Sequence, residues 1–147
     1  MTNTQIAFLL GLAYLAGTLC NRFIVARISP MKVVLIGIIG AILMAFNLII
    51  LSFIIKMNLY VVVIPIWFLF FFIGFILPNM AAKCVRLFPQ MAGTASAIYG
   101  SVVAGGVFIF SILVILIKTN TQKYLAITYF MMLIVALLFF LLSERKK

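Results

Sequence analysis

Side chains that carry acid–base, nucleophilic or metal chemistry are scarce in this sequence. It contains one carboxylate side chain, Glu144 in a charged tail, and no histidine. The two cysteines, Cys20 and Cys84, lack the close paired spacing of a metal site or a disulfide framework, and we expect them to be small packing residues. Because catalysis needs titratable groups, a nucleophile with a base, or a metal, we expect no enzyme, no metal site and no cofactor.

Uncharged polar and aromatic side chains inside long apolar runs are the remaining groups able to contact a ligand. The polar ones are Tyr14, Asn47, Thr94, Ser96, Tyr99 and Ser101. They can bind a substrate, although such groups more often bond a neighbouring helix or their own backbone. Trp67 and the phenylalanines that follow it can line a pocket for flat apolar ligands, or face lipid. No run contains a carboxylate, so this chain lacks the acids that carry protons through membrane transporters.

The composition excludes a soluble domain. Of the 147 residues, 68% are hydrophobic and 8% are charged, whereas a soluble domain carries about a quarter charged residues. Lipid is therefore the expected solvent and partner of this chain. The net charge of +10 raises the alternative of nucleic-acid binding. The cations lie in short gaps between apolar runs, however, as in membrane loops, and we expect no nucleic-acid partner.

Five apolar runs are long enough to cross a bilayer as helices. They lie at about residues 6–25, 33–55, 59–82, 92–117 and 124–142. A transmembrane helix needs about 20 apolar residues, whereas barrel strands are about ten residues long and alternate polar with apolar side chains. These runs do not alternate. The sequence therefore predicts a single all-α membrane domain over 1–147, an integral bundle of about five transmembrane helices.

The cations between the runs predict the orientation of the helices. One side of the membrane collects Arg22, Arg27, Lys32, Lys83, Arg86 and the tail cations Arg145, Lys146 and Lys147. The other side collects Lys56, Lys118 and Lys123. Because cytoplasmic loops are enriched in Lys and Arg, we expect a multi-pass protein with its N-terminus outside and its C-terminus in the cytoplasm.

Small residues mark the helix faces that we expect to pack closely. The run 92–117 carries two rows at every fourth position, namely Gly93, Ala97, Ser101 and Gly105, and Ala92, Ser96, Gly100 and Ala104. Such rows let helix backbones approach each other, so we expect tight packing, or a helix that slides against its neighbours beside a cavity. The run 33–55 repeats the pattern more weakly. The run 124–142 lacks it, and we expect that run to face lipid.

The run 59–82 contains a helix breaker. Proline removes a backbone donor and clashes with the carbonyl four residues earlier, and four residues before Pro78 stands Gly74. Glycine is the residue most able to yield at that place. We expect either a kink or hinge near the cytoplasmic end of this helix, or a proline that the membrane helix tolerates.

One stretch of the sequence resembles a known transporter family. Leu77-Pro78-Asn79 ends one run, and Phe88-Pro89-Gln90-Met91-Ala92-Gly93-Thr94-Ala95-Ser96-Ala97 opens the next. This arrangement resembles the Bcr/CflA-type drug-resistance transporters of the major facilitator superfamily. In that family a span ends in Pro-Asn, and a short cytoplasmic loop leads to Phe-Pro and an Ala-Gly-Thr-Ala-Ser-Ala string. The segment from Gly17 to Pro30 looks like a degenerate copy of the superfamily's basic loop motif, without its acidic residue and glycine-rich turn.

The resemblance covers essentially the whole chain and implies a partial facilitator fold, with the five runs as helices eight to twelve of twelve. The implied protein is the C-terminal fragment of a proton-coupled exporter of drugs or other small molecules in the bacterial inner membrane. Its proton-carrying acids would lie in an N-terminal half, which is the implied partner. Facilitator folds hold substrate between two halves, so this chain would supply one wall of the cavity and would not transport alone.

The resemblance also implies roles for particular residues. The first, third and fourth runs would border the cavity, and the second and fifth would be peripheral. The substrate-facing candidates are Tyr14, Trp67, Tyr99 and Ser101. The hinge and packing motif comprises Gly74, Pro78, Asn79, Phe88, Pro89, Ala92, Gly93, Thr94, Ala95, Ser96 and Ala97. The basic residues of the cytoplasmic loops would be Arg22, Arg27, Lys32, Lys83 and Arg86.

A different function is compatible with the same helices. A stand-alone small membrane protein that oligomerises through the small residues of 92–117 would act as a scaffold, or as a channel if its helices surround a pore. An intramembrane enzyme is a third alternative, and the shortage of acid–base groups weighs against it. An upstream reading frame that encodes the remaining apolar runs would favour the transporter fragment over the oligomer.

Overall fold

The structure, a computed structural model, describes residues 3–54, 59–116 and 122–145. Within these ranges the chain is built from helices and contains no strand, so the predicted all-α bundle is confirmed. The elements are α1 (Asn3–Val25), α2 (Pro30–Ile54), α3 (Leu59–Leu87), the short 3-10 helix η1 (Pro89–Met91), α4 (Ala92–Leu116) and α5 (Gln122–Arg145).

The long helices have the length and apolarity needed to cross a bilayer. The described residues hold five such segments, at Thr4–Val25, Pro30–Ile54, Val62–Leu87, Pro89–Ile112 and Ala126–Ser143. A helix satisfies its own backbone hydrogen bonds, which is why long apolar sequence takes this form in lipid. The class that this fold defines is a multi-pass membrane protein.

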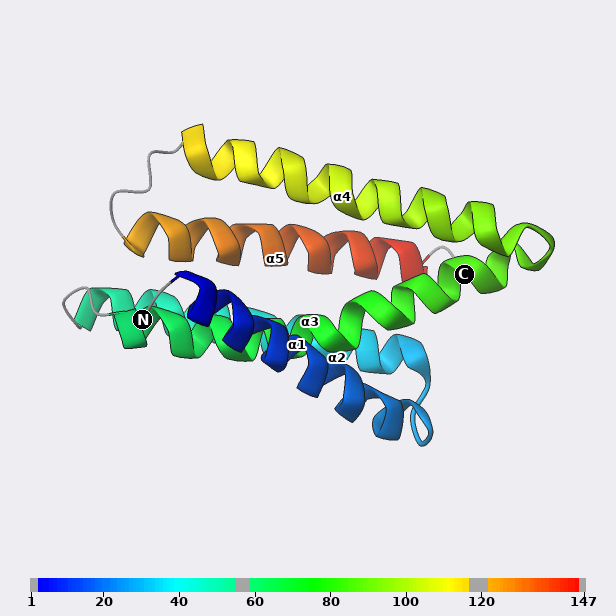
Figure 1. The fold of residues 1–147 in the computed structure, drawn as a ribbon, viewed down its shortest axis with the longest axis horizontal. Coiled ribbons are helices and arrows are strands. Elements are labelled where there is room, and N and C mark those ends of the chain that lie inside the picture. Colours follow the sequence, from blue (N-terminus) through cyan, green and yellow to red (C-terminus); the bar gives the residue numbers. More distant parts are fainter. Residues whose placement is uncertain (1–2, 55–58, 117–121, 146–147) are drawn as a thin grey trace.

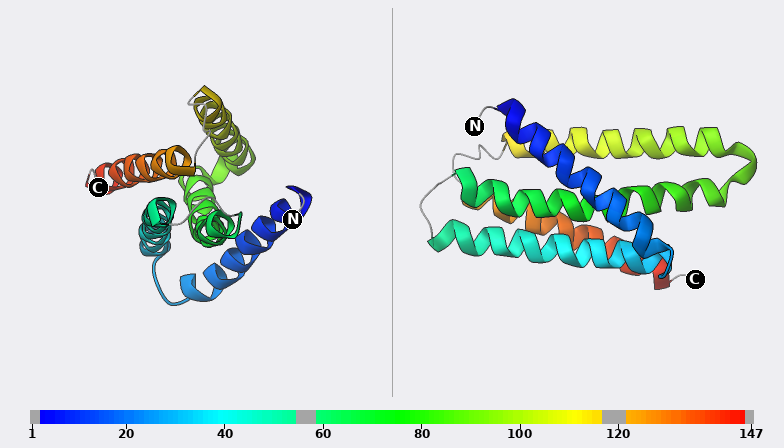
Figure 2. Two further views of the ribbon diagram at one scale, coloured as in Figure 1. Left: turned by 90° about the vertical axis from the view of Figure 1, so that its left-hand side faces the viewer. Right: turned by 60° about the horizontal axis from the view of Figure 1, so that its bottom comes forward.

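Successive helices run antiparallel, so their connections alternate between the two ends of the bundle (Figure 1). The α1–α2 turn, the α3–α4 connection and the end of α5 lie at one end, which we call the basic end, and the N-terminus lies at the other (Figure 2). The basic end carries Arg22, Arg27, Lys32, Lys83 and Arg86. The fold therefore gathers the expected cytoplasmic cations together, while the side of the membrane that they face stays a prediction.

Helix α3 lies at the centre, with α1, α2 and α4 around it and α5 against α2 (Figure 2). Buried small residues of α2, including Gly40, Ala41 and Ala45, allow α2 and α3 to pack closely. A Cβ on Gly40 would collide with the ring of Phe72 on α3, so glycine makes room for this aromatic side chain. Helix α2 is the most covered helix within this chain, and its expected position away from a substrate cavity stays a prediction.

Helix α5 packs on α2 through one face. Phe130 and Leu133 lie against the buried pair Ala41 and Ala45. On the opposite face of α5, Phe139 is exposed. The face of α5 that carries Phe139 therefore fits the expectation of a lipid-facing helix. The face that carries Phe130 and Leu133 belongs to the core of the bundle.

Helix α1 crosses α3 at two glycines. A Cβ on Gly17 would collide with the carbonyl oxygen of Phe71, and a Cβ on Gly74 would lie 2.8 Å from the carbonyl oxygen of Tyr14. Glycine at both positions lets the two backbones touch, which is how helices associate in lipid without a hydrophobic driving force. Gly74 therefore has a packing role in addition to its place four residues before Pro78.

Helix α3 runs without interruption through two internal prolines, Pro65 and Pro78. Its ribbon bends part-way along its length, as the expected kink requires (Figure 1). Each proline removes one backbone donor and crowds the preceding turn, which bends a helix without ending it when neighbouring helices support it.

The basic residues lie mostly on helices and not in loops, which corrects the sequence-based assignment. Helix α3 continues past residue 82 to Leu87, so Lys83 and Arg86 lie on its last turns. Arg22 lies in the last turn of α1 and Lys32 in the first turn of α2. Of the five, Arg27 alone occupies a turn. Long cationic side chains reach water from a helix end, so the apolar run can stop before the helix does.

Candidate functional site

A buried pair of asparagines joins α1 to α3 near the basic end. The side-chain Nδ2 of Asn79 donates one hydrogen bond to Oδ1 of Asn21 and another to the carbonyl oxygen of Phe75, each 2.7 Å long. Asn79 is 5% exposed and Asn21 is 8% exposed. Buried amides are costly unless they are hydrogen-bonded, and here they bond each other across two helices. Asn79, expected in a hinge motif, thus acts in this structure as an interhelical tie.

Helix α4 is held to α3 by two further polar contacts. The hydroxyl group of Tyr99 donates a 3.0 Å hydrogen bond to the carbonyl oxygen of Leu77, in the turn that contains Pro78. The thiol of Cys84 donates to the carbonyl oxygen of Ala95 at 3.6 Å. Both contacts lie in the first half of α4, where the helix leaves the α3–α4 connection. Tyr99 therefore makes an interhelical hydrogen bond, and its expected contact with a substrate stays a prediction.

The predicted motif 88–97 forms the connection from α3 to α4. Phe88 and Pro89 are exposed, and Pro89 begins η1, where its missing N–H costs no hydrogen bond. Ala95 is buried against α3, and Ala92 is half-buried. Gly93, Thr94, Ser96 and Ala97 are exposed. The motif thus splits into a side that packs on α3 and a side that no described part of the chain covers.

The substrate-facing candidates do not form one cluster. Tyr14 lies on α1 where its carbonyl oxygen meets Gly74 of α3, and Tyr99 lies on α4 and donates to the carbonyl oxygen of Leu77 of α3, so the two tyrosines lie on different helices that both pack on α3. Trp67 is half-buried on α3, where its ring packs edge-on against Phe68 at 5.1 Å and parallel to Phe71 at 6.4 Å between centroids. Ser101 lies on another side of α4 and is exposed.

Helix α4 has three distinct faces. The face toward α3 and α5 carries Tyr99 and Phe110, and the ring centroid of Phe110 lies 5.6 Å from that of Tyr129 on α5. A second face carries large aliphatic residues such as Val102, which is 68% exposed. We call the third the small-residue face, and it comprises Gly93, Ala97, Gly100, Ser101, Ala104 and Gly105.

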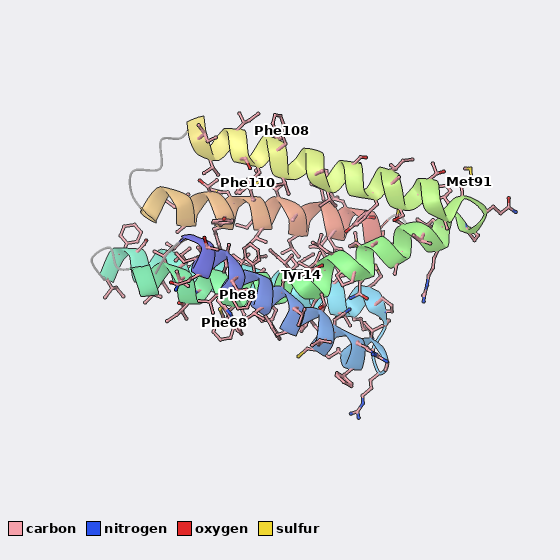
Figure 3. The ribbon with its side chains drawn as sticks, viewed as in Figure 1. Phe8, Tyr14, Phe68, Met91, Phe108 and Phe110 are labelled. Atoms are coloured by element: carbon pink, nitrogen blue, oxygen red, sulfur yellow. The ribbon has the colours of Figure 1, made fainter. Side chains whose placement is uncertain are left out.

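The small-residue face has no covering partner among the described residues. Every residue on it is exposed, and a Cβ built on Gly93, Gly100 or Gly105 would meet no atom within 4 Å. Phe108 continues this face, is 66% exposed and points away from α5, whereas Phe110 points toward it (Figure 3). Within the described residues, close packing occurs on α2 and at the α1–α3 glycines, and tight packing of a further helix along 92–117 stays a prediction.

Two contacts near the basic end are not apparent from the sequence. Asn21 lies within the segment 17–30 that resembles a loop motif, but it is buried on α1 as the acceptor for Asn79. The sulfur of Met31 lies 3.2 Å from Nζ of Lys83. The signal for Asn21 was present, since a buried amide in an apolar helix needs a partner, but the pairing with Asn79 depends on how α1 crosses α3.

Comparisons with protein-family models, with curated proteins and with solved structures found no match. Among the described residues, no group of three or more His, Cys, Asp or Glu side chains could hold a metal ion. The described residues thus define a multi-pass helical membrane protein whose α4 presents a small-residue face that none of them covers.

Proposed function

We propose that this chain is the C-terminal, five-helix part of a facilitator-type exporter of small molecules in the bacterial inner membrane. In this proposal α1, α3 and α4 border one wall of the substrate path, and an N-terminal half supplies the opposite wall. The observation that carries the proposal is the uncovered small-residue face of α4.

This face is unsuited to lipid and suited to another helix. A helix surface that faces lipid is built from bulky apolar side chains, and α4 has such a surface at Ile98 and Val102. A row of Gly, Ala and Ser instead allows two helix backbones to come into contact, where packing and weak hydrogen bonds hold them. Helix α4 thus has one surface that suits lipid, one that packs on its own bundle and a small-residue face that suits a further helix. This combination fits a helix at the edge of an assembly that another polypeptide completes.

Two tyrosines on helices that pack on α3 fit a wall that contacts substrate. Tyr14 lies where α1 crosses α3 at Gly74, and Tyr99 lies where α4 meets α3 at Leu77. Tyrosine can present both a ring and a hydroxyl group to a drug-like molecule. The sole carboxylate side chain, Glu144, belongs to the end of α5, so proton-carrying acids come from the partner in this proposal.

The test combines co-purification with transport. We expect the tagged full chain, purified in mild detergent from its own cells, to bring down a polypeptide that supplies the missing helices. Gly100→Leu fills the small-residue face and should lose this polypeptide. The matched control Val102→Leu enlarges the opposite face and should retain it.

Cells with both polypeptides should export a lipophilic cationic dye in a proton-dependent way, and deleting this chain should abolish that export. Unchanged export after the deletion would refute the proposal.

The same small-residue face also fits a second copy of this chain, which would make the protein a scaffold or a channel. Single cysteines distinguish these functions. In a Cys20→Ser, Cys84→Ser background, Ala97→Cys would form a disulfide-linked dimer in the membrane if copies meet at this face. Crosslinking to the co-purified polypeptide, without a dimer, would support the exporter.

A further inference from the structure

The basic end contains a hollow of about 360 Å³ between three helices. Its lining comes from the end of α1, the start of α2 and the last turns of α3, and comprises Val25, Ser29, Pro30, Met31, Asn79, Ala82, Lys83, Arg86 and Leu87. Two of these side chains are cations, and the others are mostly apolar. We propose that this hollow binds the phosphate headgroup of an anionic phospholipid.

The charge of this end favours an anion. Lys83 and Arg86 line the hollow, and the first turn of α2, whose helix dipole places partial positive charge there, borders it at Ser29 and Pro30. The sequence contains a single acidic side chain, Glu144. Pairing with that one carboxylate would still leave the basic end, which also carries Arg22, Arg27 and Lys32, strongly positive. A charged end of this kind recruits negative groups from its surroundings.

The shape and location favour a lipid as the source of the anion. The hollow is lined by residues at the ends of helices that are long and apolar enough to cross a membrane, which is where lipid headgroups would lie in a bilayer. Its apolar lining, including Val25 and Leu87, offers a surface for the glycerol and upper acyl-chain region next to the phosphate. Basic pockets between transmembrane helices are known hosts for anionic headgroups, and each nearby cation contributes about fivefold in affinity.

A second hollow at the same end serves as an internal comparison. It is formed by the end of α1 and the α1–α2 turn alone, and its lining includes Arg22 and Arg27. Neither arginine lines the proposed site. Replacing these two cations therefore removes the same charge from the same end of the bundle without altering the hollow itself.

The experiment measures lipid binding to the purified full chain by native mass spectrometry in mild detergent. We expect phosphatidylglycerol to bind at least tenfold more tightly than phosphatidylcholine, which has a phosphate but no net charge. The double variant Lys83→Gln/Arg86→Gln should weaken phosphatidylglycerol binding by roughly thirtyfold, from about fivefold per cation. Arg22→Gln/Arg27→Gln should weaken it by less than about threefold, since charges that do not line the hollow act on the lipid only through screened attraction.

Two further variants separate the contribution of the hollow from that of its charges. Ala82→Phe fills the hollow without changing any charge and should abolish the preference for phosphatidylglycerol, and Lys83→Arg/Arg86→Lys should keep it. Circular dichroism checks that each variant retains its helices. Inorganic phosphate should compete only weakly. Full competition by millimolar phosphate, an equal loss in both double-glutamine variants, or unchanged binding in Ala82→Phe would overturn the proposal. It does not depend on transport, so its failure leaves the proposed function untouched.

Discussion

The side chain of Asn79 on α3 donates a 2.7 Å hydrogen bond to Oδ1 of Asn21 on α1, and the two residues are 58 positions apart in the sequence. This bond lies on the same side of α3 as the glycine crossing formed by Gly17 and Gly74. Close backbone contact and a buried amide pair thus hold α1 against α3 along one interface.

Breaking the asparagine pair should destabilise the bundle. Asn79→Leu leaves the Asn21 amide buried without its partner, and we expect the free energy of unfolding to fall by about 1 kcal/mol. The double variant Asn21→Leu/Asn79→Leu removes both amides and should recover part of that loss. Unfolding in an SDS titration, followed by circular dichroism, measures both changes. Strictly additive effects of the two single substitutions would contradict the pairing.

A single methyl group should separate α1 from α3. In Gly74→Ala the new Cβ would lie 2.8 Å from both the Tyr14 oxygen and the Thr18 nitrogen, which are backbone atoms that cannot turn aside. We expect a loss of roughly 2 kcal/mol in the same SDS titration, as for other overpacked sites. Gly11→Ala is the matched control on α1, because its Cβ would meet no atom within 4 Å. Equal stability of the two variants would show that the helices do not cross at Gly74.

Removing the Tyr99 hydroxyl should loosen α4 from α3. Tyr99→Phe loses the 3.0 Å hydrogen bond to Leu77 but keeps the ring. The thiol of Cys84 lies at the same helix pair, 3.6 Å from the Ala95 oxygen. In a Cys20→Ser background we expect maleimide to label Cys84 about threefold faster, which corresponds to a typical membrane hydrogen bond. Tyr129→Phe, on α5, should leave the labelling rate unchanged. An equal rise in the Tyr129→Phe variant would contradict a specific role of the Tyr99–Leu77 hydrogen bond in holding α4 to α3.

The two termini should lie on opposite sides of the membrane. Five antiparallel helices place them at opposite ends of the bundle, and the cations of the basic end predict that the C-terminus is cytoplasmic (Figure 1). Green fluorescent protein fused to the C-terminus should fluoresce, and alkaline phosphatase fused there should be inactive. A phosphatase fusion after the α4–α5 connection should be active. Activity patterns that place both termini on one side would refute the five-span topology.

Much of the architecture was predictable from local sequence. Runs of apolar residues near 20 positions long can satisfy their backbone only as helices in lipid, so the number, approximate bounds and alternation of the helices followed directly. The ends were less predictable. The apolar run before Lys83 stops at residue 82, but α3 continues to Leu87, because a helix can extend beyond the hydrocarbon when its cations reach water.

The sequence by itself determined that this chain is a bundle of five apolar helices with most of its cations at one end, because length, hydropathy and charge act locally along the chain. Only the tertiary structure decided which small residues touch another helix. Gly37 meets Phe72 and Ile76 of α3 and Gly100 meets no atom within 4 Å, although both stand in runs with small residues at every fourth position. Likewise, only the crossing of α1 over α3 makes Asn21 the partner of Asn79, since that contact depends on the rotation and position of two helices far apart in sequence.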